Sequence, residues 1–505
     1  MLRPWQTKIW LTRQRGESIH TTLSNQIADD IRLGRLASGH LMPGTRSLAT
    51  QLGVNRKTVQ SVYEELESQG WLVSKPRRGT YVADMLPESS LSREHQHLVD
   101  LGQGECSHEE RDVMKEAVNS APRSHMLMPS FLIAPNANDG IPDTRLIPYE
   151  LLSRAFRRAI VQTSRQSYMG YGDPRGTLEL RQSLQHMLNM DRFMNVSTNQ
   201  VCVVRGSQMA IYLSSRVLNP ENGALVVEAL SYTPAIAAFE SNGFSIIRCK
   251  QDERGLDVQD LERILKQHKV AGVYTTPHHQ YPTTVCLSMD RRLQLLQLSK
   301  RYEFVIMEDD YDHEFHYDSR PIPPLASLPH SENVIHMGSL SKVFAPGLRL
   351  GYMVASNAFI DRVAQEITLI DRQGNTVTEL AVADLMQSGD VKKHIRKVRK
   401  IYQARRDVTA TELTRIFGDT ITFTLPAGGL ALWIDISQRL SKKYRDHIEL
   451  KDANLSALFD GHVVVSSDKT QNAGNLRAHI RFGFGALTEE EITVALEQLA
   501  DKLKG

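Results

Sequence analysis

The residues with the clearest chemical potential surround one lysine, Lys342. Hydroxyl side chains precede it at Ser339 and Ser341, and Arg349 follows it on the same predicted loop. A partly desolvated lysine amine can form an imine with an aldehyde. Two hydroxyls and a guanidinium fork can together bind a phosphate group. A single lysine in a polar loop is more commonly an ordinary surface residue, so its interpretation depends on what the rest of the chain supplies.

Further candidate side chains follow other short apolar runs. Ser207 and Gln208 open an expected helix, which is a favourable position for a phosphate. Tyr232 follows another run, where an aromatic ring could stack on a planar cofactor. Gln280 lies in a third polar segment, residues 278–283. Each feature alone is typical of ordinary packing or of a helix start, but together they indicate a site.

An acidic segment, Glu308-Asp309-Asp310-Tyr311, follows a fourth run. By itself it is typical of a metal site or of a solvated loop. The histidines His278 and His279 could also bind metal, but no carboxylate has a recognisable ligand spacing to them, so we predict no metal site. A lysine, phosphate donors, a stacking ring and a carboxylate for a pyridinium nitrogen together suit pyridoxal phosphate.

An alternation of predicted elements would bring these side chains together. Helical patterns occupy residues 149–162, 177–188 and 289–302. Between and around them lie β-rich runs at residues 201–204, 224–227, 245–249, 270–275, 304–307, 333–337 and 349–354. This alternation predicts an α/β fold with a mostly parallel sheet and helices on both faces. Ligands of such sheets bind at the carboxyl ends of the strands, where the candidates lie.

Composition indicates a globular protein of more than one domain. The chain has 505 residues, of which 41% are hydrophobic and 23% charged, and this length exceeds what one core usually supports. The four cysteines have neither metal-ligand nor disulfide-framework spacing. The sequence has no evident signal peptide or membrane-spanning run, so we expect a cytoplasmic protein.

Positive charge is concentrated near the N-terminus. Residues 1–83 contain 12 Lys or Arg and 6 Asp or Glu, a net charge of +6, whereas the whole chain carries +2 and the remainder therefore −4. A basic segment on a nearly neutral body suggests a nucleic-acid partner.

The same segment has the pattern of a winged helix-turn-helix. Helical spacing at 19–36 is followed by a short helix at 47–52 and by a third helix after Asn55, a favourable N-cap residue. Two short predicted strands, 71–73 and 80–82, then flank a basic turn. The second helix of the turn can enter the major groove of DNA, and the wing can lie along the backbone. The alternative is a small helical domain with a solvated basic face.

The motifs of this segment resemble the DNA-binding domain of GntR-family regulators. They are Pro43-x-x-Arg46-x-Leu48-Ala49, Gly53-Val54-x-Arg56-x-Thr58-Val59, Tyr63-x-x-Leu66, and Gly70-Trp71-Leu72 through Gly79-Thr80-Tyr81-Val82. The resemblance and the positions of the basic side chains give one set of expected DNA contacts: Arg46, Arg56, Lys57, Thr58, Gln60, Arg77, Arg78 and Gly79. We expect the DNA-binding domain at 1–83, a linker at 84–129 and a second domain at 130–505.

From about Phe131 onward the chain resembles a fold-type I aminotransferase, and as a whole it resembles the MocR-type subfamily of GntR regulators. The matching motifs are Tyr171-Gly172-x-Pro174-x-Gly176, Gly206-Ser207-Gln208-x-Ala210, Pro277-x-His279-Gln280-x-Pro282-Thr283, Glu308-Asp309-Asp310-Tyr311-Asp312-x-Glu314-Phe315, the Lys342 segment, and His479-Ile480-Arg481-Phe482-Gly483-Phe484. Thr284 stands where the Pro-Thr-Gly motif has glycine, so we expect that loop to differ.

The resemblance implies a role for each candidate. Lys342 would hold the cofactor covalently, Tyr311 would meet its phenolic oxygen, and Asp309, in preference to Asp310, would meet its ring nitrogen. Arg481 would bind the carboxylate of an amino-acid ligand. The other implied cofactor contacts are Ser207, Gln208, Ser339, Ser341 and Arg349 at the phosphate, Tyr232 on the ring, Gln280, and Tyr171 from the neighbouring subunit of a head-to-tail homodimer.

The sequence therefore predicts a DNA-binding transcriptional regulator. Its effector domain would sense an amino compound that bonds to pyridoxal phosphate, or pyridoxal phosphate itself. The alternative is a pyridoxal-phosphate-dependent aminotransferase with a fused DNA-binding domain, and residual transamination is compatible with either. Pro234 stands where the GABA-responsive relative has a ligand arginine, which argues against GABA as the effector.

Overall fold

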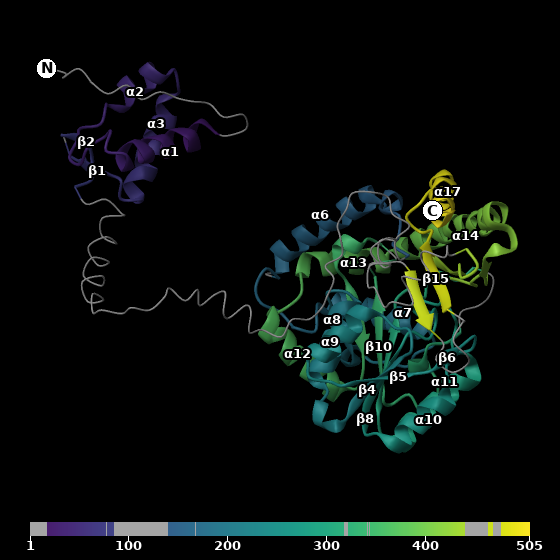
Figure 1. Cartoon of the computed structure of the whole chain (residues 1–505). Helices are drawn as coiled ribbons and strands as arrows, with labels where there is room; N and C mark the ends of the chain where they lie inside the picture. The colour runs from purple at the N-terminus through teal and green to yellow at the C-terminus, as the bar shows by residue number, and fades with distance from the viewer. Residues whose placement is uncertain are drawn as a thin grey trace, which may run out of the picture. The chain divides into compact units, whose positions relative to one another are not determined.

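The computed structural model describes residues 18–76, 78–84, 140–166, 168–317, 322–340, 342, 344–439, 463–467 and 476–504. The chain divides into two compact units, residues 1–122 and 123–505 (Figure 1). The predicted linker at 84–129 lies outside the described residues apart from Asp84. Its boundaries therefore stay a prediction.

The described part of the first unit consists of three helices and an antiparallel hairpin. The elements are α1 (Ile19–Arg32), α2 (Thr45–Leu52), α3 (Arg56–Ser68), β1 (Leu72–Lys75) and β2 (Gly79–Val82). Apolar side chains from all of them share one core, which includes Leu23, Leu48, Val59 and Leu72. Asn55 caps α3 by accepting a hydrogen bond from the backbone N–H of Lys57. The predicted winged helix-turn-helix is confirmed.

A seven-stranded sheet in the order β3-β11-β10-β9-β8-β4-β5 forms the centre of the second unit. The strands are β3 (Val201–Val204), β4 (Ala224–Glu228), β5 (Ile246–Cys249), β8 (Val270–Thr275), β9 (Val305–Asp310), β10 (Val334–Ser339) and β11 (Gly351–Val354). Only β11 runs antiparallel to its neighbours. Each β-rich run predicted from the sequence is a strand of this mostly parallel sheet.

Helices cover both faces of the sheet (Figure 1). One face carries α8 (Ser207–Val217), α9 (Thr233–Ser241) and α12 (Asn357–Ile370). The other carries α7 (Leu178–Asp191), α10 (Val258–Gln267), α11 (Met289–Tyr302) and part of α13 (Thr376–Gln387), which also packs on α6 (Tyr149–Gln166). Side chains alternate along each strand, so Leu225 and Val226 enter opposite cores.

A smaller antiparallel sheet lies in the C-terminal part. Its strands follow the order β12-β13-β15-β14. They are β12 (Thr422–Phe423), β13 (Ala431–Asp435), β14 (Val463–Ser467) and β15 (Leu476–Gly483), and they pack with α14 (Asp390–Phe417) and α17 (Glu489–Lys504). A short hairpin pairs β6 (Gln251–Asp252) with β7 (Gly255–Leu256). The Thr488–Glu491 capping box at α17 is present. Among the described residues, no helix combines the length and hydrophobicity that crossing a membrane requires.

The acidic segment differs from its predicted position, because Glu308, Asp309 and Asp310 lie within β9 and are all buried. Burial is tolerated because the carboxylates have partners. Glu308 accepts a hydrogen bond from the backbone N–H of Leu325 at 2.6 Å, and Asp310 pairs with Arg192 at 3.0 Å. Alternation along the strand turns Asp309 to the opposite face from Asp310. The fold thus distinguishes Asp309 from Asp310, which the spacing in the sequence could not do.

Candidate cofactor site and DNA-binding surface

Tyr311 connects Lys342 to Arg481. The Lys342 Nζ atom lies 4.4 Å from the centroid of the Tyr311 ring. The Tyr311 hydroxyl donates to the backbone oxygen of His279 at 2.7 Å, and Arg481 Nη2 donates to the same hydroxyl at 3.4 Å. Three of the residues singled out in the sequence are therefore brought together, although the loops after β9 and β10 and strand β15 supply them separately.

Asp309 is buried with one carboxylate oxygen unsatisfied. The Tyr274 hydroxyl donates to Asp309 Oδ2 at 2.9 Å, whereas Asp309 Oδ1 has no hydrogen-bond partner among the residues that the structure describes. Burial raises the pKa of the Asp309 carboxyl to about 7, although the hydrogen bond from Tyr274 and the charge of Lys342 oppose the rise. An unpaired buried acceptor is destabilising. A ring N–H donor facing Oδ1 would remove this cost, so the carboxylate fits a pyridinium nitrogen.

Tyr281 connects Tyr232 to Arg481. The rings of Tyr232 and Tyr281 meet edge to face, with centroids 5.2 Å apart, and the Arg481 guanidinium carbon lies 4.9 Å from the Tyr281 centroid. Arg481 Nη1 also donates to the backbone oxygen of Pro282 at 2.8 Å. Arg481 is only 4% exposed, and these contacts hold its guanidinium in one orientation near the predicted stacking tyrosine.

Close approaches at two glycines show that the predicted phosphate-binding residues lie near one another. Gly206 precedes α8 with φ +83°, and a Cβ atom there would lie 3.2 Å from the Arg349 guanidinium. Ser339 pairs with Gly351 across β10 and β11, and a Cβ on Gly351 would come within 2.9 Å of Gly206. Ser207 is the first residue of α8. Hydroxyls, a guanidinium and a helix N-terminus are thus close together, which is a favourable arrangement for a phosphate.

The remaining cofactor candidates have different surroundings. Gln208 donates to the backbone oxygen of Pro234 at 3.0 Å, while its buried Oε1 has no partner within the described ranges. The Gln280 amide donates to Glu228 at 3.2 Å and to a nearby backbone oxygen at 2.6 Å, so it ties neighbouring loops together. Tyr171 is 82% exposed and is a surface residue within a single chain. Ser341 lies outside the described residues.

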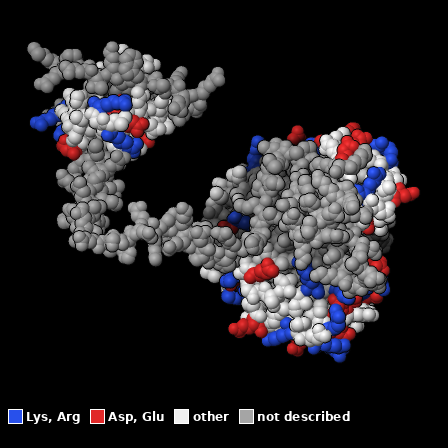
Figure 2. Space-filling model, viewed as in Figure 1, with Lys and Arg blue, Asp and Glu red and all other residues white. Residues whose placement is uncertain are grey.

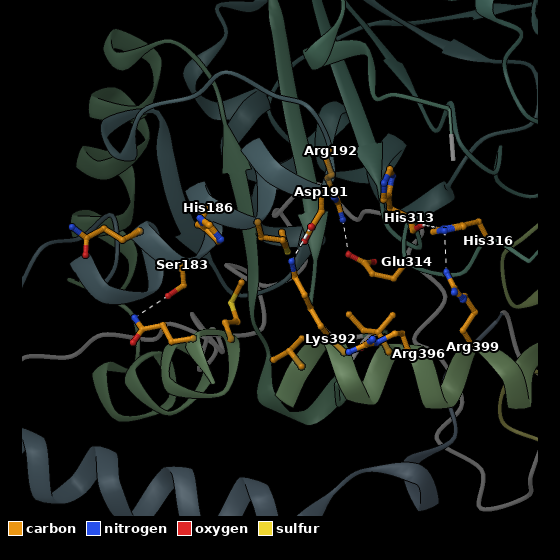
Figure 3. Close-up of a pocket in the computed structure, with 16 residues that line it drawn as sticks. Ser183, His186, Asp191, Arg192, His313, Glu314, His316, Lys392, Arg396 and Arg399 are labelled. Carbon is orange, nitrogen blue, oxygen red and sulfur yellow. Dashed lines mark hydrogen bonds and ion pairs between the residues drawn. The ribbon is translucent and has the colours of Figure 1, made fainter. Parts of the chain in front are cut away.

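The sequence analysis did not identify three residues that contact the candidate side chains: two tyrosines and one arginine. Tyr274 holds Asp309, and Tyr281 bridges two predicted residues. Tyr274 is the penultimate residue of a predicted strand, so its neighbour across the sheet could be identified only with the strand order. Arg192 pairs with Asp310 at 3.0 Å and with Glu314 at 2.6 Å. It lines a cavity of ≈590 Å³ between α7 and α14 (Figure 3).

The first unit presents basic and polar side chains on α2 and at the start of α3. Arg46, Arg56, Lys57 and Gln60 are exposed, whereas Thr58 is half-buried. Figure 2 shows Lys and Arg side chains on the visible face of this unit. Exposed side chains at the start of the recognition helix are free to contact base edges or phosphates.

The wing is a tight basic turn. Arg78 is exposed, and Gly79 has φ +110°, with Leu41 so close that a Cβ atom on residue 79 would lie 3.0 Å from its side chain. A side chain at residue 79 would be strained by both the backbone and the contact. Arg77 lies outside the described residues.

Known proteins match both units. Residues 96–499 match the family described as aminotransferase class I and II, and residues 20–82 match the bacterial regulatory proteins of the gntR family. The probable rhizopine catabolism regulatory protein MocR of Rhizobium meliloti is 27% identical over 422 residues, covering 84% of this chain and 82% of that protein. The sequence resemblance to both families is confirmed.

Two further relatives match the second unit. Aromatic-amino-acid aminotransferase 1 of Thermococcus litoralis is 28% identical over 370 residues, covering 72% of this chain and 87% of that protein. The crystal structure of LysN, an alpha-aminoadipate aminotransferase from Thermus thermophilus complexed with N-(5'-phosphopyridoxyl)-L-leucine, superimposes with a TM-score of 0.61. It is 25% identical, and the match covers 73% of this chain and 92% of that one. Aminotransferases of this class depend on pyridoxal phosphate.

Proposed function

This chain belongs to the class I and II aminotransferase family and carries a GntR-type DNA-binding domain, and we propose that it is a transcriptional regulator whose second unit binds pyridoxal phosphate and responds to an amino compound. The single observation that supports cofactor binding best is the buried Asp309 Oδ1 atom, which has no partner in the described part of the chain. DNA binding through the first unit would place its action in the cytoplasm.

The chain's own residues divide the work of holding the cofactor. Pyridoxal phosphate supplies an aldehyde that condenses with amines and a ring that withdraws electrons. Lys342 would supply the amine, and Asp309 would accept a hydrogen bond from the ring nitrogen. Ser207, Ser339 and Arg349 would bind the phosphate.

Four other candidates complete the proposed contacts. Tyr232 would stack on the ring, and Tyr311 would meet its phenolic oxygen. The side-chain amide of Gln208 has a second N–H besides the one that it donates to Pro234, and this N–H would donate to the phosphate. Gln280 would position the surrounding loops. Asp310 is excluded from the ring nitrogen in this proposal because Arg192 and two histidines surround it on the other face.

Arg481 would select the effector. Its buried guanidinium lies beside Tyr311 and Tyr281, and a guanidinium in such surroundings binds a carboxylate strongly. An effector with both an amino group and a carboxylate would therefore meet Lys342 and Arg481 together. For the effector to change DNA binding, it must have different affinities for two arrangements of the protein.

Reduction with borohydride tests the cofactor assignment. Protein incubated with pyridoxal phosphate and then reduced should carry one covalent phosphopyridoxyl group, located on Lys342 by peptide mass spectrometry. Lys342→Ala should lose the label, while Lys300→Ala, which removes an exposed lysine from α11, should keep it. A label on another lysine, or none in the wild type, would refute the assignment.

DNA titrations then separate two kinds of signal. The probe is an operator selected by the wild-type protein from random-sequence DNA, and its affinity is measured by fluorescence anisotropy. If pyridoxal phosphate alone changes the affinity, the cofactor itself is the signal. If only an added amino acid changes it, the protein senses the amino compound.

Aminotransferase activity is the second candidate function. It is favoured by the grouping of Lys342, Asp309 and Arg481 near Tyr311 and by the similarity to an aromatic-amino-acid aminotransferase. Steady-state assays over pairs of amino donors and keto acids distinguish the two functions. Sustained turnover at roughly 1 s⁻¹ or more would be ordinary for an enzyme and would favour this candidate.

A further inference from the structure

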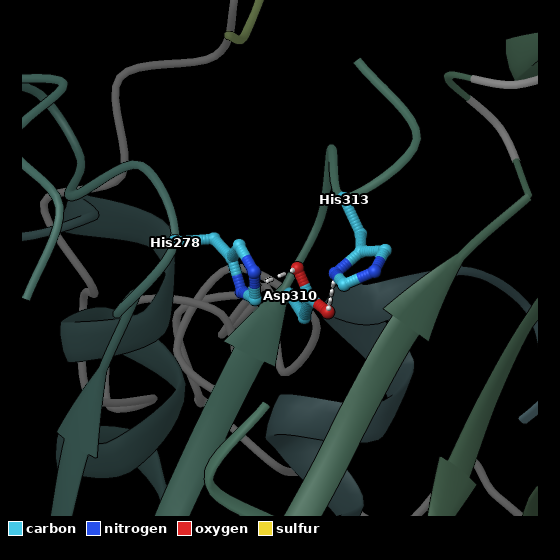
Figure 4. Close-up of side chains that lie close together, drawn as sticks. All are labelled: His278, Asp310 and His313. Carbon is cyan, nitrogen blue, oxygen red and sulfur yellow. Dashed lines mark ion pairs between the residues drawn. The ribbon is translucent and has the colours of Figure 1, made fainter. Parts of the chain in front are cut away.

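Two histidines and an aspartate form a buried cluster behind the candidate cofactor site (Figure 4). His278 follows β8, Asp310 ends β9, and His313 lies one short turn later. His278 Nδ1 is 3.5 Å from Asp310 Oδ1, and His313 Nδ1 is 3.0 Å from Asp310 Oδ2. One ligand atom from each residue lies within 4.8 Å of the other two.

Several polar atoms in this cluster lack hydrogen-bond partners among the described residues. They are both ring nitrogens of His278, Oδ1 of Asp310 and Nδ1 of His313, whose contact with Asp310 Oδ2 has the distance of an ion pair but not the geometry of a hydrogen bond. All three side chains are buried, with exposures of 6%, 7% and 1% in that order. Buried polar groups are nearly always satisfied by protein, water or an ion. One such atom from each of the three residues lies at the same place, which indicates a ligand that binds nitrogen and oxygen at once.

The side chains around Asp310 leave its Oδ1 atom available to a cation. Arg192 binds Asp310 at Oδ2, 3.0 Å away, so it orients the carboxylate while Oδ1 keeps its lone pairs. Arg192 is shared with Glu314 at 2.6 Å, so two carboxylates face one guanidinium. If both are ionised, the group keeps a net negative charge that would offset a bound cation.

An ion could reach the cluster from solvent. His278 and His313 both line a cavity of ≈450 Å³. His313 also borders the ≈590 Å³ cavity that Arg192 lines (Figure 3). Water in either cavity could supply the coordination position that three protein ligands leave open.

We propose that His278, Asp310 and His313 bind a divalent transition-metal ion, with Zn²⁺ as the probe. Two imidazoles and one carboxylate are ligands that such ions accept, whereas Mg²⁺ and Ca²⁺ prefer oxygen. Zn²⁺ with bonds of about 2.0–2.2 Å in tetrahedral geometry separates its ligands by roughly 3.3 Å. The observed separation of 3.5 Å between His278 Nδ1 and Asp310 Oδ1 lies close to that value.

A bound ion would join the ends of β8 and β9 directly behind Asp309 and His279. Through His279 it would support Tyr311, whose hydroxyl donates to the His279 backbone. The ion would thus be structural for the loops of the candidate cofactor site rather than a part of that site.

Calorimetry on the full chain tests the proposal. The protein, without a histidine tag or pyridoxal phosphate, is stripped with a chelator and titrated with Zn²⁺. We expect one ion per chain, and at least about tenfold weaker binding in His278→Gln and in His313→Gln. His316→Gln is the matched control, because His316 lines the same cavities but lies outside the cluster, and it should bind as the wild type does.

Co²⁺ provides a readout on the unmutated protein. A stoichiometric Co²⁺ complex should show visible absorbance with a band shape that reports nitrogen and oxygen ligation, and Zn²⁺ should displace it. The proposal is overturned if the wild type binds less than one ion, or if His278→Gln and His313→Gln bind as tightly as His316→Gln. Because pyridoxal phosphate is absent throughout, failure here is distinct from failure of the proposed cofactor function.

Discussion

The ionisation of Asp309 links the candidate site to the stability of the fold. Its folded-state pKa of about 7 lies above the ordinary value of 3.8. Between these two values the folded state keeps a proton that the unfolded state has lost, so stability falls as pH rises. Below pH 3.8 the carboxyl is protonated in both the folded and the unfolded state, and above a pH of about 7 the loss of stability is complete.

Asp309→Asn should remove this pH dependence from the cofactor-free protein. We expect the wild type to lose up to about 4 kcal/mol of stability relative to the variant between pH 4 and pH 8. Urea unfolding of the cofactor-free proteins at several pH values measures the difference. Glu228 also has a pKa raised to about 7 by burial, but it is common to both proteins. Parallel pH profiles would contradict the prediction.

The sequence identified single residues as candidates only where the chemistry of the side chain was unusual for its place in the predicted fold. Lys342 and Asp309 stood out by chemistry, and both lie in the assembled site. Tyr274 did not, because its contact to Asp309 joins adjacent parallel strands. His278 and His313 were missed as a pair for the same reason, since their meeting depends on which strands are neighbours.

At the scale of elements, the periodic pattern predicted which strands are present better than it predicted the residues at which they begin and end. All seven strands of the main sheet were found in the sequence, and β3 and β8 have the predicted ends. Among the strands, the largest error is at the end of β9, where acidic residues indicated a loop but paired carboxylates continue the strand. Polarity marks a loop only if the polar groups reach water, and here they reach Arg192, Tyr274 and backbone donors instead.

The turn after β8 carries strain at Thr284. Its backbone has φ +63°, and its N–H donates to the Gln280 backbone oxygen at 2.7 Å within a tight turn. Thr284 therefore takes a backbone conformation that glycine favours. A β-branched residue is unfavourable there.

Thr284→Gly should stabilise the second unit by up to about 1 kcal/mol. This value is the free-energy cost of a left-handed backbone at a residue with a Cβ atom, reduced by the cost of the larger conformational entropy of glycine in the unfolded chain. Thr284→Ala is the control, because it removes the branch but keeps a Cβ atom. Urea midpoints of the second unit, followed by far-ultraviolet circular dichroism, provide the comparison. A Gly variant no more stable than the Ala variant would show that the turn is not strained.

At the scale of the whole molecule, DNA reading and cofactor binding should be separable. Arg56 is exposed at the first position of α3. Its replacement by alanine should weaken operator binding by about 1–3 kcal/mol, or lower the slope of log affinity against log salt by about 1 if it contacts a phosphate. Borohydride labelling of Lys342 should be unchanged.

Arg301→Ala is the control for this experiment. It removes the same charge from an exposed position on α11 of the second unit. Anisotropy titrations of the selected operator at several salt concentrations compare the variants. Equal operator affinity for Arg56→Ala and wild type would remove Arg56 from the proposed DNA surface.

The head-to-tail dimer that the resemblance implies would complete each candidate site with a tyrosine from the other subunit. Tyr171 is 82% exposed, and Met169 beside it is 75% exposed. Exposed apolar side chains this close together suit an interface. If the Tyr171 hydroxyl donates to the phosphate of the neighbouring subunit, Tyr171→Phe should weaken pyridoxal phosphate binding about tenfold, the value of one hydrogen bond to a charged group.

Mixing two defective variants tests whether that contact crosses the dimer. In a heterodimer of Tyr171→Phe and Lys342→Ala, a contact across the interface leaves one site with both wild-type residues and the other with neither. A contact within one chain leaves no complete site. We therefore expect co-refolded mixtures to recover a population that binds pyridoxal phosphate with wild-type affinity, measured by borohydride labelling at increasing cofactor concentration. Mixtures that show only the affinity of Tyr171→Phe would exclude a shared site.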